Sequence, residues 1–403
     1  MFIMKLTLLL LTVLYVVYAK TIDQPTHIIK LKSMMNATTA YTLSRKKQDD
    51  PSLYRRSFSV PDAIDLFALD DNFTVMSGIF SDNAFIDYLH DQYAVEYVEP
   101  NHIYKAQVQY ANLRTEVASS WGLARINTRY ERNNLSHYTF DEFAGEGVHV
   151  YVLDTGVNIA HVDFGDRATN EANFVEEEGP TDLGGHGTHV AGKIAGSLYG
   201  IAKKANVHSV KILNRLGDGA LSNIIKGISH VITVAEPGKS IINLSLSGPK
   251  SQLIDDILTK VVVDHHIPVF VAAGNSASDA CLFSPSSNPH VFSVGASDLN
   301  DDVPAYSNVG GCVQLYAPGS EIESTWINGP NQSKILDGTS MANPHVSGIA
   351  AALLSKRTYA NVQELYQAIA LTATVNTLSF KWSAPVVSNN NLLAFINSYD
   401  LQE

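Results

Sequence analysis

Gly338-Thr339-Ser340-Met341-Ala342-Asn343-Pro344 is the stretch around which the chain is organised. An apolar run with helical spacing follows it, which predicts a helix that begins beside Ser340; its members are Val346, Ile349, Ala350, Leu353 and Leu354. Unpaired N–H groups at a helix N-terminus are suited to the negative charge of an acyl-transfer transition state. Ser340 is therefore a candidate nucleophile. The same pattern is typical of an ordinary N-cap, so a base and an orienting acid must be found elsewhere.

Asp154 is the candidate acid, because it directly follows the apolar, strand-like run 148–153. In Asp154-Thr155-Gly156 its carboxylate is expected at the end of a buried strand, although a plain turn aspartate has the same setting. An aspartic protease would need a second such carboxylate close by. Asp337-Gly338-Thr339 has the wrong residue order to supply it.

His186 is the candidate base. It lies in Gly184-Gly185-His186-Gly187-Thr188-His189, before a run of small residues. Imidazole titrates near neutral pH, which suits removal of a proton from Ser340. Zinc is a rival interpretation, since His161, Asp163 and His189 are near in sequence, but no His-Glu-x-x-His or comparable spacing occurs.

Asn275 ends the strand-like run 269–273 as Gly274-Asn275. It is either a turn residue or a donor to a developing oxyanion, a contribution of about 3 kcal/mol in acyl-transfer enzymes.

Composition sets the wider limits. The 403 residues allow two or three domains, and the net charge of −12, without a long Lys/Arg cluster, argues against nucleic acid or an anionic membrane as partner.

Residues 1–19 carry Lys5, a short apolar run and Val17-Tyr18-Ala19, which predict a cleaved secretory signal peptide and no membrane anchor afterwards. Cys281 and Cys312 then lie in an oxidising compartment, as a disulfide or as buried thiols.

The pattern of elements changes along the chain. Residues 20 to about 110 predict an α+β module, with strands at 27–31, 73–80 and 95–100, a helix at 83–92 and a polar stretch at 44–58. From Gly147 strands and helices alternate, which predicts an α/β fold with a parallel sheet covered on both faces. Its expected strands are 148–153, 207–213, 241–246, 267–273 and 291–296, and its expected helices are 220–235 and 252–264.

The ordered motifs around Asp154, His186, Asn275 and Ser340 resemble those of the subtilisin-like serine proteases, particularly the fungal proteinase K and cerevisin group. The resemblance runs from Trp121-Gly122-Leu123 to Leu393-Ala394-Phe395. It implies a subtilisin-like parallel sheet and a serine endopeptidase, with Ser340, His186 and Asp154 as triad and Asn275 as oxyanion donor. It also implies a signal peptide at 1–19, a self-cleaved inhibitory propeptide at 20–112, cut somewhere within 106–116, and a catalytic domain at 113–403.

The same resemblance implies how substrate binds. An extended peptide is expected between two edges and a pocket, formed by Gly217, Gly219, Ser245, Leu246, Ser247, Ala272 and Gly274. The apolar pocket implies hydrophobic or aromatic residues before the cut. Partners are then polypeptide substrates and the chain's own propeptide, with a monomeric protein that is secreted or vacuolar.

Several positions depart from the family pattern. Ser247 stands where glycine is usual, so the pocket is expected to be narrower; Asn214, Leu221 and Val190 replace other common residues. No cofactor is expected, and calcium is left open: Gln314 stands where some relatives have a calcium-binding aspartate, and an amide oxygen binds calcium more weakly. A bridge between Cys281 and Cys312 matches a cysteine pair of some relatives. Glycosylation acceptors are Asn36, Asn72, Asn134 and Asn331, whereas Asn243 lies in a strand-like run.

Two other functions remain open from sequence. The substitutions in the cleft are compatible with a catalytically silent binding protein of the same fold. The same triad is also compatible with hydrolysis of esters or other acyl groups.

Overall fold

The computed structural model describes residues 26–32, 64–70, 73–79, 83–106, 109–110, 120–129, 135, 137–380 and 389–396. The expected signal peptide, the polar stretch 44–58, and Asn36, Asn72 and Asn134 lie outside these residues. Among the helices of the described residues, none is long and apolar enough to cross a membrane.

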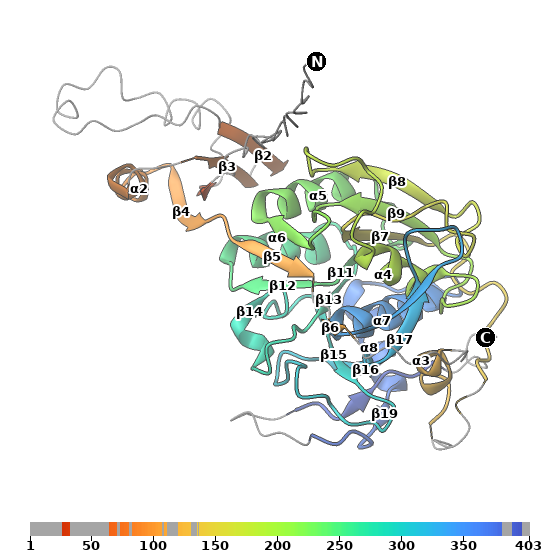
Figure 1. The fold of residues 1–403 in the computed structure, drawn as a ribbon. Coiled ribbons are helices and arrows are strands. Elements are labelled where there is room, and N and C mark those ends of the chain that lie inside the picture. The colour runs from red at the N-terminus through yellow and green to blue at the C-terminus, as the bar shows by residue number, and fades with distance from the viewer. Residues whose placement is uncertain are drawn as a thin grey trace, which may run out of the picture.

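A nine-stranded sheet forms the centre of the main body (Figure 1). Its strand order is β19-β20-β16-β15-β13-β11-β7-β9-β8, and every neighbouring pair is parallel except β19 with β20. The bounds are β7 (His149–Asp154), β8 (Ala168–Asn173), β9 (Asn206–Lys211), β11 (Ser240–Leu244), β13 (Val269–Ala272), β15 (Phe292–Ser297), β16 (Leu315–Pro318), β19 (Thr374–Val375) and β20 (Leu392–Leu393). The central strands β11 and β13 are buried at every residue, as a sheet covered on both faces requires.

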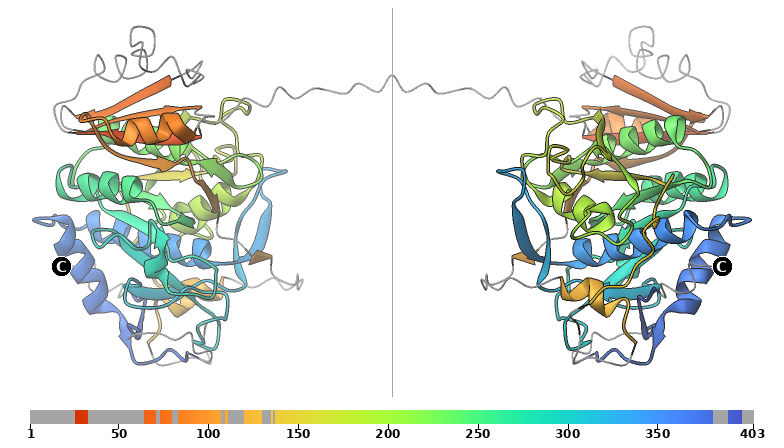
Figure 2. Two further views of the ribbon diagram at one scale, coloured as in Figure 1. Left: turned by 90° about the vertical axis from the view of Figure 1, so that its left-hand side faces the viewer. Right: turned by 90° about the vertical axis from the view of Figure 1, so that its right-hand side faces the viewer.

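Helices lie on both faces of this sheet (Figures 1 and 2). The pair α4 (His186–Ala195) and α7 (Thr339–Leu354) packs together, and so does the pair α5 (Leu221–Val234) and α6 (Gln252–Val263). Residues 339–352 of α7 are all buried, because the helix is apolar or small on every side. The main body also contains α3 (Trp121–Arg125) and α8 (Val362–Thr372).

A small N-terminal module packs on the α5 and α6 side (Figure 2). Its antiparallel sheet has the order β2-β3-β1-β4, formed by β1 (His27–Leu31), β2 (Ile64–Asp70), β3 (Phe73–Gly78) and β4 (Val95–Pro100), with α2 (Asn83–His90) beside it. Side chains of β1 alternate between two cores. Ile29 and Leu31 pack with Leu89 of α2, whereas Ile28 belongs to the core of the main body.

Beyond the module, the chain runs into the main body as two short strands. β5 (Ile103–Ala106) joins β10 (Asp218–Ala220), β12 (Leu246–Pro249) and β14 (Phe283–Ser284) in a sheet of order β10-β5-β12-β14. β6 (Gln109–Tyr110) joins a hairpin of β17 (Ile322–Thr325) and β18 (Ser333–Asp337). Segments far apart in sequence therefore meet along one edge of the main sheet.

The expected α/β architecture is confirmed, with differences at element ends. The strand expected at 241–246 is two strands, β11 and β12, because the chain leaves the main sheet at Ser245 and pairs with β5 instead. The strand expected at 73–80 ends at Gly78, and the helix expected at 83–92 ends at His90. Sequence patterning missed several elements, among them β2, β8, β16, the β17–β18 hairpin and α8. Of these, β8 is mostly polar and the strands of the hairpin are short.

Candidate active site

Asp154 and His186 are joined by a buried hydrogen bond. Asp154 ends β7, is fully buried, and accepts hydrogen bonds at Oδ1 from Thr155 N (2.7 Å) and from His186 Nδ1 (2.8 Å). His186 begins α4 and is 5% exposed. Because Nδ1 faces the carboxylate, Nε2 is the imidazole nitrogen left for chemistry, and among the described residues it has no hydrogen-bond partner.

The loop before His186 is fixed by a residue to which sequence reasoning gave no role, Asp182. Its Oδ1 accepts from Thr155 Oγ1 (2.8 Å), Gly184 N (3.0 Å) and Gly185 N (2.8 Å). Its Oδ2 accepts from Thr188 N (2.9 Å) and Thr188 Oγ1 (2.6 Å). An aspartate placed a few residues before a glycine-rich helix start is a typical capping signal that could have revealed this role.

Ser340 lies in the first turn of α7, beside the strand end that carries Ser245. Its Oγ donates to the Ser245 carbonyl at 2.8 Å, and among the described residues no hydrogen bond joins it to His186. Pro344 has no N–H to donate to the carbonyl of Ser340, and Ser245 Oγ donates to that carbonyl instead (3.2 Å). Ser245 thus holds the start of α7 through both its hydroxyl and its carbonyl.

Asn275 follows β13 and faces the start of α7. Its Oδ1 accepts from Thr339 N (3.0 Å) and from Thr339 Oγ1 (2.8 Å), which fixes the plane of the amide. The amide NH₂ therefore points away from Thr339. Asp154, Ser245 and Asn275 all stand at carboxyl ends of parallel strands, where such sheets collect functional residues.

The two edges predicted for substrate hold a strand of the chain itself. β5 pairs antiparallel with β10, where Tyr104 faces Gly219, and antiparallel with β12, where Ala106 faces Leu246. After the two residues that separate β5 from β6, Gln109 faces Asp337, three residues before Ser340. The strand that pairs with Ala106 directly follows Ser245, and the strand that pairs with Gln109 ends three residues before Ser340.

Tyr104 is the best-defined side chain of this inserted strand. It is fully buried, and its ring lies against Gly248, where an added Cβ would come within 2.4 Å of Tyr104 Cδ1. Its hydroxyl donates to the carbonyl of Pro249 at 3.0 Å, and burial raises its pKa well above the ordinary value.

The wall predicted for the primary pocket, Ala272 to Gly274, continues β13. Gly274 has φ +103°, so glycine is favoured there. Its N–H donates to Thr339 Oγ1 (3.1 Å) and its carbonyl accepts from Asn308 N (2.8 Å). Gly217, also predicted for substrate, has φ +79° and lies in the turn before β10, where Asn214 Oδ1 accepts from Leu216 N and Asp218 N.

The histidines near His186 do not converge on a metal. His189 Nε2 bonds to the carbonyls of Ile322 and Lys334 at 3.0 Å each, and burial lowers its pKa to about 3. His161 Nε2 bonds to the Gln332 carbonyl at 2.9 Å. Within the described part of the chain, no group of three or more His, Cys, Asp or Glu side chains could hold a metal ion.

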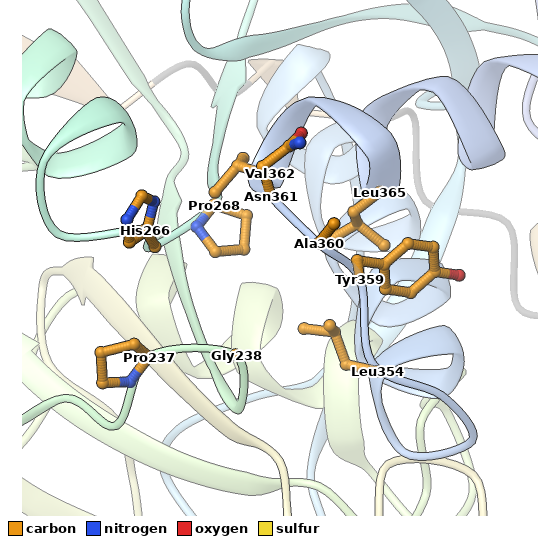
Figure 3. A pocket seen from close by; sticks show the side chains of 10 residues that line it. All are labelled: Pro237, Gly238, His266, Pro268, Leu354, Tyr359, Ala360, Asn361, Val362 and Leu365. Carbon is orange, nitrogen blue, oxygen red and sulfur yellow. The ribbon is translucent and has the colours of Figure 1, made fainter.

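A cavity of about 230 Å³ lies away from these residues (Figure 3). Pro237 and Gly238 precede β11, and Pro268 precedes β13, so it lies at the opposite ends of the strands from Ser245 and Asn275. The facing side chains come from the end of α7 and from 359–365, and they are mainly apolar. Such a lining offers no acid, base and nucleophile together.

Comparison with known proteins decides the family. Residues 145–391 match the model described as "Subtilase family". The chain belongs to the subtilase family.

Relatives agree with this assignment. "Subtilisin-like protease 8" of Trichophyton verrucosum is 42% identical over 277 residues, covering 65% of this chain and 55% of the relative. "Subtilase-type proteinase psp3" of Schizosaccharomyces pombe is 41% identical over 264 residues, covering 64% and 57%. The chain thus spans little more than half the length of these relatives. The crystal structure of a cold adapted subtilisin-like serine proteinase matches with a TM-score of 0.63 and 37% identity, covering 69% of this chain and 98% of that one.

The subtilase domain contains the expected disulfide between Cys281 and Cys312, with a Cα–Cα distance of 5.3 Å. At the calcium position considered from sequence, Gln314 provides an amide in place of a carboxylate. Gln314 Oε1 is neutral and already accepts from Ser293 N at 2.6 Å. Asn331 is exposed, as a glycosylation acceptor needs to be, whereas Asn243 is fully buried and donates to Ser347 Oγ.

Proposed function

We propose that this subtilase is the precursor of a serine endopeptidase that cuts its own chain. The observation that carries the proposal is β5, which lies as a middle strand between β10 and β12, the two edges expected to bind substrate. Main-chain pairing to two edges is a way to bind an extended peptide largely independently of its sequence. The chain's own segment thus occupies the place of a peptide substrate.

The chemistry follows from the contacts of each group. For attack, Ser340 Oγ exchanges its hydrogen bond with the Ser245 carbonyl for one with His186 Nε2, which takes the proton and later gives it to the leaving amine. Asp154 holds His186 through Nδ1 and stabilises the imidazolium. The Asn275 amide and the Ser340 N–H, in the first turn of α7, donate to the oxyanion.

The N-terminal module is the inhibitory propeptide in this proposal. Ala106 pairs with Leu246, which directly follows Ser245, whose carbonyl accepts from Ser340 Oγ. Gln109 pairs with Asp337 on the other side. We therefore expect the cut between Gln107 and Val108, which moves the boundary of the mature enzyme from 112/113 to 107/108.

The apolar wall of Ala272 and Ala273 supports a hydrophobic residue before the cut, with specificity otherwise broad. The expected leader at 1–19, the disulfide and the exposed Asn331 support secretion of a monomeric glycoprotein, with delivery to a vacuole as the alternative. Activity without a metal cofactor is proposed from the charge and bonding of Gln314.

The decisive experiment is expression of the precursor beside a Ser340→Ala version, with intact mass and N-terminal sequencing of both products. The wild type should yield a mature chain that begins at Val108, while Ser340→Ala stays whole after removal of the leader. A fluorophosphonate should label only the wild type. Equal processing of both chains, or folded wild type without labelling, would contradict the proposal; the latter result favours a silent binding protein.

A further inference from the structure

Ser247 stands at a position where its side chain meets the substrate pocket. It is the second residue of β12, is 6% exposed, and pairs with Lys105 of the inserted strand. Its neighbours face the other way: Leu246 belongs to the main core, and Gly248 lies against the ring of Tyr104. Because side chains alternate along a strand, the hydroxymethyl group of Ser247 points to the opposite face.

On that face lies Gly274, the end of the predicted pocket wall. A Cβ built on Gly274 would come within 3.0 Å of Ser247 Oγ, so the hydroxyl reaches across the gap between β12 and the wall. The wall has little freedom to move away. Gly274 is bonded through both its N–H and its carbonyl, and Asn308 Nδ2 also donates to the Ala273 carbonyl at 2.9 Å.

The alternation also places the substrate. Consider a peptide that binds in the place of β5. Its residue opposite Ser247 points its side chain to the same face as the Ser247 hydroxymethyl. The residue two positions further along the peptide points to that face as well, because side chains alternate along a strand. The latter residue is the one before the cut under the proposed function. Its side chain therefore enters the pocket on the face where the Ser247 hydroxyl already lies close to Gly274.

We propose that Ser247 is a specificity-determining residue that narrows this entrance. The enzyme then prefers unbranched side chains of small or medium size before the cut and disfavours Phe, Tyr and Trp. This inference rests on the proposed function and refines its hydrophobic preference by size. The chain's own residue at this position, Gln107, is unbranched and carries no ring.

The test uses mature wild type and the variants Ser247→Gly and Ser247→Ala, with peptides Tyr-Lys-Ala-X that release a chromophore after X. Wild type should cleave X = Met or Gln at least about tenfold better than X = Phe, as judged by kcat/KM. Ser247→Gly should raise the Phe-to-Met ratio about tenfold, because it removes the obstructing atoms. Ser247→Ala keeps Cβ and should give an intermediate Phe-to-Met ratio. It replaces Ser247→Gly in the test if the glycine variant folds poorly.

Ser209→Gly is the matched control, because it removes the same atoms from a buried strand serine of β9 and should leave the ratio unchanged. Fluorophosphonate labelling of every sample separates the two proposals. Labelled wild type that prefers Phe, or a Phe-to-Met ratio that does not change in Ser247→Gly, overturns the role of Ser247 and leaves the protease standing. No labelling and no turnover overturn both.

Discussion

The N-terminal module and the subtilase domain differ in how each is held together. Among the residues that the structure describes, the module's own core contains Ile29, Leu31, Met76, Leu89, Ala94 and Val95. Its other apolar face, with Ile28, Phe73 and Val75, belongs to the core of the main body. The subtilase domain surrounds its nine-stranded sheet with helices and carries a disulfide. A small sheet that shares its core with a neighbour depends on docking, whereas the larger body does not.

Polar contacts at the docking surface strengthen this contrast. Tyr97 donates to Asp256 of α6 at 2.8 Å, and Ser251 at the start of α6 donates to Glu99 at 2.5 Å. Asn101 accepts from Ser222 N at the start of α5 (3.2 Å). The module thus places polar groups at the N-termini of two helices of the main body, where donors are otherwise unpaired.

The largest expected effect lies in the subtilase domain alone. Asp154→Asn should lower kcat for a peptide substrate by about 10⁴-fold, because the amide favours the wrong tautomer of His186. Melting temperature of the purified precursor should change little, since the shape of the buried residue is kept. A kcat within tenfold of wild type would remove Asp154 from the proposed mechanism.

A second change tests docking. In the Ser340→Ala precursor, Tyr104→Ala should lower the free energy needed to detach β5 by about 3 kcal/mol, because it removes a fully buried ring and leaves a cavity. Hydrogen exchange of the β5 amides reports this opening, and amides of β11 should be unaffected. Tyr104→Phe is the matched control: it loses only the bond to the Pro249 carbonyl, an effect of about 1 kcal/mol. Equal exchange in the Ala and Phe variants would contradict this role of the ring.

The disulfide should stabilise the other region. Replacing Cys281 and Cys312 by serine opens a loop with a sequence separation of 31 residues and should cost about 3 kcal/mol in the free energy of unfolding of mature enzyme. Chemical denaturation measures this loss. In the precursor under native conditions, loss of the disulfide should leave the hydrogen exchange rate of the β5 amides unchanged. Faster exchange in β5 would show that the two regions are coupled more tightly than their separate cores indicate.

The smallest expected effect is a pH dependence of docking. Burial raises the pKa of Glu99 and of Asp256, and it raises that of Asp255 to about 6 despite hydrogen bonds from Ser284 and Ser287. Other charged or titratable groups facing this cluster are Lys30, Glu96, Tyr97, Tyr104 and Lys250. Undocking rehydrates Glu99 and returns its pKa toward the ordinary value near 4. A docked pKa of Glu99 above the undocked one means that docking is stabilised at low pH and weakened as pH rises from about 4 through the docked pKa of Glu99.

Opening of β5 in the Ser340→Ala precursor should therefore increase on the order of threefold between pH 5 and pH 7, after correction for intrinsic exchange rates. Glu99→Gln, which cannot ionise, should reduce this slope. A slope of opposite sign, or one that Glu99→Gln leaves intact, would show that other groups control docking.

Patterning and motif spacing predicted much of this molecule because their physical causes are local. Buried parallel strands need continuous apolar runs, so β7, β13 and β15 were recognisable, and β1 and β4 were predicted to the residue. The glycine-rich turns and small residues around His186 and Ser340 marked the site, since helix starts have local signals. The role of Asp182 was missed although most of its partners are local; only its bond from Thr155, 27 residues away, lies beyond a local signal.

The α/β class, the family and the residues proposed to carry the chemistry could be predicted from sequence, because these predictions rest on periodicity and on ordered motifs. What lies against those residues depends on the folded chain. The tertiary structure splits the strand at 241–246 at Ser245, inserts β5 between β10 and β12, and brings the Ser247 hydroxyl over Gly274. Each of these depends on contacts between segments far apart in the chain, whose register is set by packing and main-chain hydrogen bonds.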